Sequence, residues 1–129
     1  MTGDYSEGRA TAEYLLYLNA GEESPLWDLT SGAENYFHDD YVTIHPALPR
    51  ELVAATLLQA LEYGDVVLYD ADDPEKAEIP REEAIRVTNN PAYYTFETAP
   101  AMICVCVTDT GEARWRTMKS PEFERRPRD

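Results

Sequence analysis

The stretch PRELVAATLLQALEYGDVVLYD, residues 49–70, gives the clearest structural signal in the chain. Its first part carries an apolar stripe at helical spacing, made by Val53, Leu57, Ala60 and Leu61. This stripe predicts a helix over residues 49–63, with a proline in its first turn and Gly64 at its end. The apolar run that follows predicts a short strand over residues 65–70.

Further elements are predicted on both sides of this stretch. Apolar spacing and a serine–proline start predict helices over residues 10–19 and 25–37. A further proline-led helix is predicted over residues 79–90. Two runs at 101–107 and 112–118 predict a C-terminal β-hairpin whose turn contains a glycine.

The predicted fold is therefore α+β, with three N-terminal helices, a short strand, a further helix and a C-terminal β-hairpin. The length of 129 residues suits one domain with one hydrophobic core. We expect residues 1–8 to be a mobile N-terminus, residues 9–118 a single globular domain, and residues 119–129 a basic polar tail.

The net charge of −14 is the strongest signal in the composition. Residues 1–113 hold 5 basic and 22 acidic side chains, whereas residues 114–129 hold 6 basic and 3 acidic ones. An acidic body repels phosphate backbones and anionic membranes and attracts basic proteins. A large charge also keeps a protein soluble, so the acidity alone does not establish a partner.

The two cysteines, Cys104 and Cys106, are interpreted as structural. Residues two apart in a strand lie beyond comfortable disulfide reach, and an unbroken apolar run is typical of a strand buried on both faces. In the predicted hairpin register they share the core face with Trp115. A zinc site would need two more ligands, and the chain holds no other cysteine.

The predicted order of helices, strand and late hairpin resembles that of winged-helix domains, over residues 25–118. The resemblance implies a DNA-binding regulator whose wing arginines contact phosphates. The candidate nucleic-acid contacts are Arg114, Arg116, Arg125 and Arg126. Helix 49–63 would enter the major groove, but its exposed set includes one arginine and two carboxylates. Such a set is poorly suited to reading bases, which disfavours a nucleic-acid partner.

Other chemistries find little support in the sequence. His38, Asp39, Asp40 and His45 have types that suit a metal, yet they also suit a helix end and a loop. The run from Asp70 to Glu75 lacks the glycine and glutamate positions of a calcium loop. Phosphate-binding and nucleophile-elbow motifs are absent. We therefore expect no catalytic residues, no metal and no cofactor.

A non-catalytic acidic domain that docks a basic partner protein is the function that the sequence favours. Tyrosines are enriched at interfaces, and acidic side chains around them suit a basic surface. The candidate partner-binding residues are Asp39, Asp40, Tyr41, Tyr69, Asp70, Asp72, Asp73 and Glu75. In composition the chain is similar to small acidic bacterial immunity or antitoxin proteins and to DNA-mimic proteins.

Two expectations concern location and assembly. The chain has neither a secretory signal nor an apolar window long enough to cross a membrane, so we expect a cytoplasmic protein without membrane contact. The basic tail could also fold onto the acidic body of a second copy, giving a homo-oligomer held in part by charge.

Overall fold

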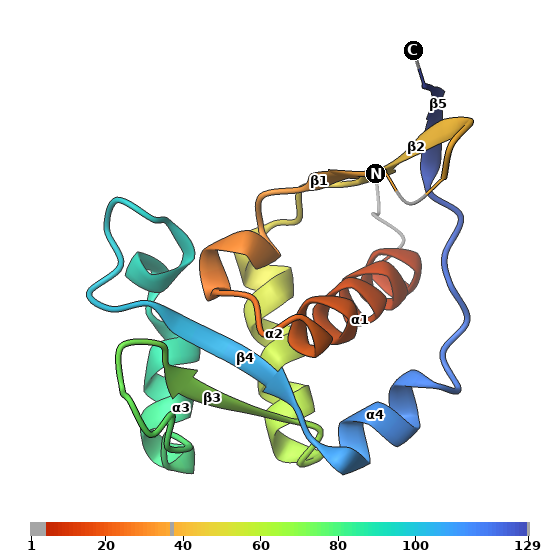
Figure 1. Cartoon of the computed structure of the whole chain (residues 1–129). Helices are drawn as coiled ribbons and strands as arrows, with labels where there is room; N and C mark the ends of the chain where they lie inside the picture. The colour runs from red at the N-terminus through yellow and green to blue at the C-terminus, as the bar shows by residue number, and fades with distance from the viewer. Residues whose placement is uncertain (1–4, 37, 129) are drawn as a thin grey trace.

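The computed structural model describes residues 5–36 and 38–128 (Figure 1). The α-helices in this part of the chain are α1 (Tyr5–Gly21), α2 (Arg50–Glu62), α3 (Arg81–Asn89) and α4 (Asp109–Trp115). Two 3₁₀-helices are η1 (Leu26–Leu29) and η2 (Pro91–Tyr94). The strands are β1 (Ala33–Asn35), β2 (Tyr41–His45), β3 (Val66–Asp70), β4 (Ile103–Val107) and β5 (Glu124–Pro127). The predicted α+β class is confirmed.

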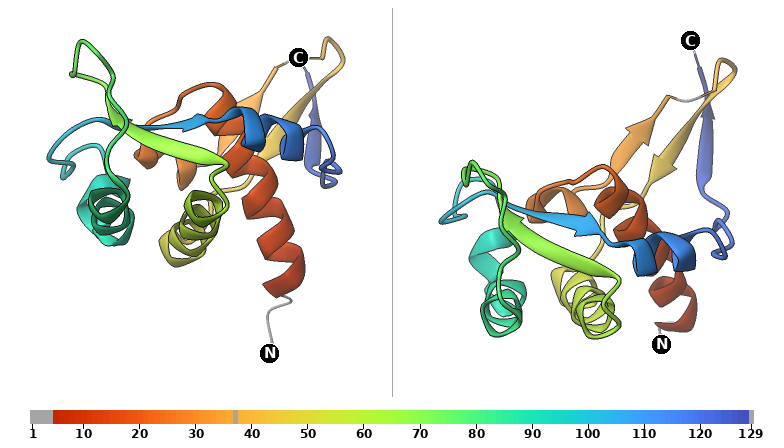
Figure 2. Two further views of the ribbon diagram at one scale, coloured as in Figure 1. Left: turned by 90° about the horizontal axis from the view of Figure 1, so that it is seen from below. Right: turned by 60° about the horizontal axis from the view of Figure 1, so that its bottom comes forward.

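The body of the protein is a two-stranded antiparallel sheet with helices packed beneath it. Strand β3 pairs with β4 in a register that joins Val66 to Val107 and Asp70 to Ile103. Helices α1, α2 and α3 lie side by side under this sheet (Figure 2). None of the described helices has the length and apolarity to cross a bilayer.

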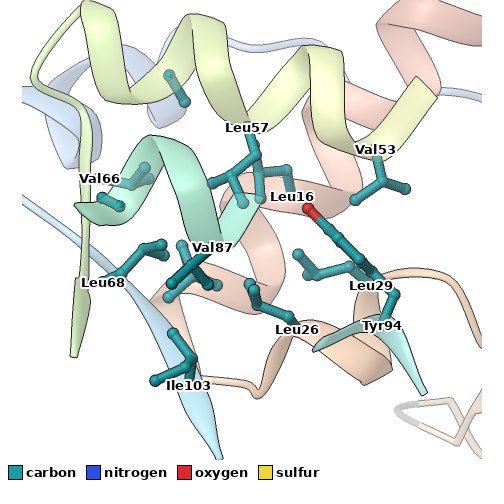
Figure 3. Close-up of a cluster of buried hydrophobic side chains, with 14 of the residues drawn as sticks. Leu16, Leu26, Leu29, Val53, Leu57, Val66, Leu68, Val87, Tyr94 and Ile103 are labelled. Carbon is teal, nitrogen blue, oxygen red and sulfur yellow. The ribbon is translucent and has the colours of Figure 1, made fainter. Parts of the chain in front are cut away.

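Side chains from all of these layers meet in one core (Figure 3). Leu26, Leu57, Leu68, Val66 and Val105 are the largest apolar side chains that are fully buried. Each edge of this sheet is bridged at one point, because Pro25 forms a bridge to Cys104 and Glu78 forms a bridge to Tyr69.

The remaining strands form a separate sheet that projects from the body, with the order β1-β2-β5 (Figures 1 and 2). Both pairings are antiparallel. We call this sheet the β-arm. Its strands alternate between two faces. Val42 is buried on one face, whereas Tyr41, Thr43 and His45 line a groove between the other face and α1.

Five predicted elements are confirmed by the structure. The helices predicted over residues 10–19, 49–63 and 79–90 correspond to α1, α2 and α3, and the strands predicted over 65–70 and 101–107 correspond to β3 and β4. Helix α1 begins at Tyr5, inside the segment expected to be mobile. Strand β5 lies inside the expected polar tail. Residues 1–4 and 129 lie outside the described part of the chain.

The helix predicted over residues 25–37 is wrong. Only η1 forms there, and β1 follows it with Ala33 opposite His45. The interruption occurs at Gly32, whose positive φ of 72° departs from helical geometry. A Cβ at this glycine would lie 2.8 Å from the backbone nitrogen of Ala47, so the chain also passes too closely here for a side chain. Position 37 lies outside the described residues.

The C-terminal hairpin predicted over residues 101–118 is also wrong. The segment after β4 forms α4, because Thr108 caps this helix by accepting a hydrogen bond from the Gly111 backbone N–H at 3.1 Å. Strand β4 pairs with β3 instead, so Cys104 lies opposite Tyr69 rather than Trp115. The three-helix start and the winged-helix arrangement therefore do not match the structure.

The start of α4 packs so tightly on Asp65, just before β3, and on the end of β4 that a substitution can test it. A Cβ at Gly111 would lie 2.0 Å from the Asp65 carbonyl oxygen and 2.7 Å from the Val107 side chain. We expect Gly111→Ala to lower the free energy of unfolding by about 2 kcal/mol or more, because backbone must move. Gly21→Ala is the control, since its Cβ meets no atom within 4 Å. Urea denaturation should place this control within about 0.5 kcal/mol of the wild type, and equal losses in both variants would contradict the packing.

Candidate functional site

The structure separates the predicted partner-binding residues into two groups at different ends of the molecule (Figure 1). Asp39, Asp40 and Tyr41 lie at the tip of the β-arm, in and beside the connection from β1 to β2. Asp70, Asp72, Asp73 and Glu75 lie at the end of β3 and in the loop toward α3. The two groups therefore cannot form one continuous surface.

The loop after β3 is folded by its own carboxylates. The Asp70 side chain accepts a hydrogen bond from the Asp72 backbone N–H at 2.9 Å. The two Asp73 oxygens accept hydrogen bonds from the backbone N–H groups of Glu75 at 3.0 Å and Ala77 at 3.1 Å. Such aspartate turns fix the loop backbone. Asp70 and Asp73 are therefore partly engaged inside the protein.

Three further carboxylates in this region point to solvent. Asp72, Glu75 and Glu78 are exposed, and no side-chain partner is seen for them among the described residues. The Glu23 carboxylate, which accepts a hydrogen bond of 2.8 Å from the Tyr69 hydroxyl, belongs to the segment along the opposite edge of the sheet. We call Asp72, Glu75 and Glu78 the acidic edge. The edge is a set of carboxylates on an ordered backbone.

Tyr69 was predicted to contact a partner directly, but its side chain is 7% exposed. Burial, followed by the hydrogen bond to Glu23, raises its pKa above the ordinary value. The Lys76 ammonium lies 5.7 Å from the centre of the Tyr69 ring, on the loop side. Tyr69 therefore holds Glu23 and Lys76 in place rather than offering its own surface.

Each of the four arginines predicted to contact nucleic acid has a partner within the chain. Arg116 binds Glu112 at 2.6 Å, and the Arg125 guanidinium lies 4.5 Å from the centre of the Tyr41 ring. Arg126 lies 3.7 Å from Glu34 on β1. Arg114 donates a hydrogen bond of 2.5 Å to Asp65. Their charges are therefore already partly compensated.

Asp65 is a buried carboxylate that no sequence pattern singled out. It is fully buried, and one of its oxygens accepts hydrogen bonds from the Tyr17 hydroxyl and from Arg114. Its backbone carbonyl accepts a hydrogen bond from the Thr108 N–H at 2.9 Å. These contacts join α1, the residue before β3, and α4 together with its N-cap. A local sequence pattern could not predict this role of Asp65, because its partners Tyr17, Arg114 and Thr108 are distant in the sequence.

The groove between α1 and the β-arm has a volume of about 640 Å³. It contains both histidines, His38 and His45, together with Tyr41 and Phe123. Burial lowers the pKa of His45, which favours its neutral form. His38 stacks on Tyr41 with ring centres 4.4 Å apart. The described residues contain no cluster of three or more side chains suited to holding a metal.

Both cysteines are free thiols, and burial raises the pKa of each. A raised pKa lowers the fraction of reactive thiolate at neutral pH. Their place in β4, with Cys104 fully inside the sheet and Cys106 half-buried beside it, fits the structural interpretation.

No protein-family model matches this chain, and no curated protein or solved structure gives a significant match to it.

The Asp65 cluster predicts how stability changes at alkaline pH. Burial and the hydrogen bond to Asp65 raise the pKa of Tyr17 above its ordinary value of 10.0. The unfolded chain therefore releases this proton at a lower pH than the folded chain does. The contribution of Tyr17 is complete below pH 10.0 and is lost as the pH rises further.

The measurement is a series of urea denaturations between about pH 8 and pH 11. We expect the wild type to lose stability with a steeper slope than Tyr17→Phe, which has no phenolic proton at this position. The variant should be less stable at neutral pH by about 1–3 kcal/mol, because it removes a hydrogen bond to a buried carboxylate. Identical slopes would show that Tyr17 does not titrate as described.

Proposed function

We propose that this chain is a non-catalytic protein-binding domain whose acidic edge docks a basic partner protein. The observation that carries the proposal is the set of exposed carboxylates of Asp72, Glu75 and Glu78, which have no partner side chain in the described structure. Most acidic side chains can move freely in solvent, but these three project from a loop that Asp70 and Asp73 hold in one conformation.

The fixed conformation of this loop favours binding. A flexible acidic loop would lose conformational freedom when a partner arrives, and that loss would weaken the complex. Here the hydrogen bonds from backbone N–H groups to Asp70 and Asp73 already fix the loop. The net charge of −14 would steer a basic protein toward the domain and speed association. A docking function of this kind agrees with the compositional similarity to immunity, antitoxin and DNA-mimic proteins.

The tip of the β-arm has weaker support as the docking surface than the acidic edge. Asp39 and Asp40 lie beside the arginines of β5, and the Asp40 backbone carbonyl accepts a hydrogen bond of 3.1 Å from the Arg128 N–H. Tyr41 is covered by Arg125 on one side and stacked with His38. Positive charge from the chain itself thus already offsets the negative charge there.

The alternative of a DNA-binding regulator also has weaker support. It depends on Arg114 and Arg116 being available for phosphates, whereas these two arginines bind Asp65 and Glu112. A phosphate would have to compete with both carboxylates and approach an acidic body.

Two variants of equal charge test the acidic edge. The first is Asp72→Asn/Glu75→Gln/Glu78→Gln. The matched control is Glu13→Gln/Glu62→Gln/Glu97→Gln, which also removes three negative charges but from other parts of the surface. Each full-length protein, and the wild type, is used to capture proteins from native lysate at low and at high salt, and bound proteins are identified by mass spectrometry.

We expect the wild type and the control to retain one stoichiometric basic protein at low salt and to release it as salt rises. The acidic-edge variant should bind that protein roughly tenfold more weakly, since each exposed ion pair contributes up to about 1 kcal/mol. Equal capture by the two variants would show that net charge rather than the acidic edge is responsible. The absence of any stoichiometric basic protein would contradict the proposed function itself.

A further inference from the structure

Strand β5 is attached to the rest of the protein through the β1–β2 hairpin. It pairs with β2 in an antiparallel register that joins Ile44 to Glu124 and Tyr41 to Pro127. Every hydrogen bond, ion pair and ring contact found between the described residues 124–128 and other segments goes to residues 34–45. None of these contacts goes to the helices or to the β3–β4 sheet.

Arginines on both faces of β5 secure this attachment. Arg125 lies over the Tyr41 ring on the groove side, and Arg126 lies 3.7 Å from Glu34 on the opposite face. Arg128 donates a hydrogen bond of 2.8 Å to the His38 carbonyl oxygen. Its guanidinium also lies 5.4 Å from the centre of the Tyr36 ring. The β1–β2 hairpin thus binds one strand through the arginines at these positions.

The connection between the body and β5 is long and has few ties. Between α4 and β5, residues 117–123 form no helix or strand, and they cross from the body to the arm (Figure 1). Met118 packs against the core, and the Phe123 ring meets Tyr14 and His45 at the other end. Residues 119–122 lie between these anchors, and their proline favours an extended backbone. This segment can serve as a hinge.

If β5 left its own hairpin, the backbone N–H and C=O groups along that edge of β2 would lose their hydrogen-bond partners. Unpaired backbone groups along a strand are a template for another strand, so release of β5 from its own hairpin would be followed by pairing with a β5. The strand known to fit is β5 itself. A second copy supplies it with the same register, the same arginine contacts and the same Phe123 packing, so the exchange would retain all the contacts described above.

Charge also favours the β-arm as the place where two copies meet. Most of the surface is acidic, and two chains of charge −14 repel each other. The arm is close to locally balanced, because Arg125, Arg126 and Arg128 lie on the same sheet as Glu34 of β1 and the β1–β2 connection that carries Asp39 and Asp40. Two arms can therefore approach with less repulsion than two acidic edges.

We propose that β5 exchanges between two copies of this chain, so that each β1–β2 hairpin binds the β5 of the other copy in a closed, two-fold symmetric dimer. Exchange of an identical element is a low-cost route to a dimer, because it repeats contacts already made within one chain. The contacts of β5 are the same in monomer and dimer, so their salt dependence cancels. The remaining electrostatic contribution to dimerisation is repulsion between the two acidic bodies. Salt screens this repulsion, so the dimer fraction should rise with salt.

Cysteine substitutions at paired positions distinguish the two arrangements. Thr43 and Arg125 lie opposite each other in the β2–β5 register. Full-length Thr43→Cys and Arg125→Cys proteins carry different tags and are mixed at high concentration, then treated with a short thiol cross-linker. The wild type, which keeps Cys104 and Cys106, is the control for reaction at native thiols. The double variant on one chain, at low concentration, shows whether the pair can be linked at all.

Exchange predicts a cross-linked heterodimer carrying both tags in the mixture, and a monomeric internal cross-link in the dilute double variant. Light scattering of the wild type should show a species of doubled mass whose share rises with protein concentration and with salt. An internal cross-link in the double variant without any heterodimer in the mixture would overturn the proposal. So would a dimer that dissociates as salt rises, because that dimer would be held by charge between the copies. This salt response is opposite to that of a basic partner at the acidic edge, so failure of one proposal leaves the other testable.

Discussion

The buried carboxylate of Asp65 is the interaction on which the arrangement of the body depends. Moving a carboxylate out of water costs several kcal/mol unless hydrogen bonds and a counter-charge replace the lost hydration. Here the Tyr17 hydroxyl and the Arg114 guanidinium do so at one of the two carboxylate oxygens. Tyr17 belongs to α1, Asp65 precedes β3, and Arg114 belongs to α4. One charge therefore forces three elements that are far apart in the sequence to meet at one point.

The position of α4 has consequences for the rest of the chain. Thr108 donates hydrogen bonds to two consecutive carbonyls, from its hydroxyl to Gly64 and from its N–H to Asp65, and Gly111 allows the helix to rest on the Asp65 carbonyl. With α4 fixed in this way, the chain leaves the body toward α1 and rises to the β-arm. The basic C-terminal strand then lies far from the acidic edge (Figure 1). The protein thus keeps a charge-balanced arm at one end and exposed carboxylates at the other.

Local sequence patterns predicted the elements that depend on local signals. The apolar stripe of α2, the proline-led start of α3 and the apolar runs of β3 and β4 were sufficient for those four elements. The error at residues 108–111 arose because threonine, aspartate and glycine suit a hairpin turn as well as a helix cap. What decides between the two is the partner of β4, which is β3 from 33 or more residues earlier in the chain.

Local sequence patterns also failed to predict the β-arm and the burial of residues near the candidate site. Strands β1 and β5 are short and polar, and they form because each finds β2, which no local signal predicts. Asp72 and Glu75 were named from the sequence as candidate partner-binding residues. The burial of Tyr69 and of Asp65 was missed, because it depends on Glu23, Tyr17 and Arg114 arriving from elsewhere in the fold. Contacts between distant segments, rather than composition, separate Asp39 and Asp40 from the acidic edge.

Amide hydrogen exchange of Asp65→Asn against the wild type tests the role of the buried charge most directly. Asparagine has nearly the same shape but no charge, and it can turn an NH₂ group toward Arg114. We predict that exchange of the α4 amides becomes at least about tenfold faster, because hydrogen bonds to a charged group contribute about 1.5–3 kcal/mol. Exchange in α3, which does not contact Asp65, should change much less. Unchanged protection of α4 in the variant would contradict the claim that Asp65 holds this helix on the body.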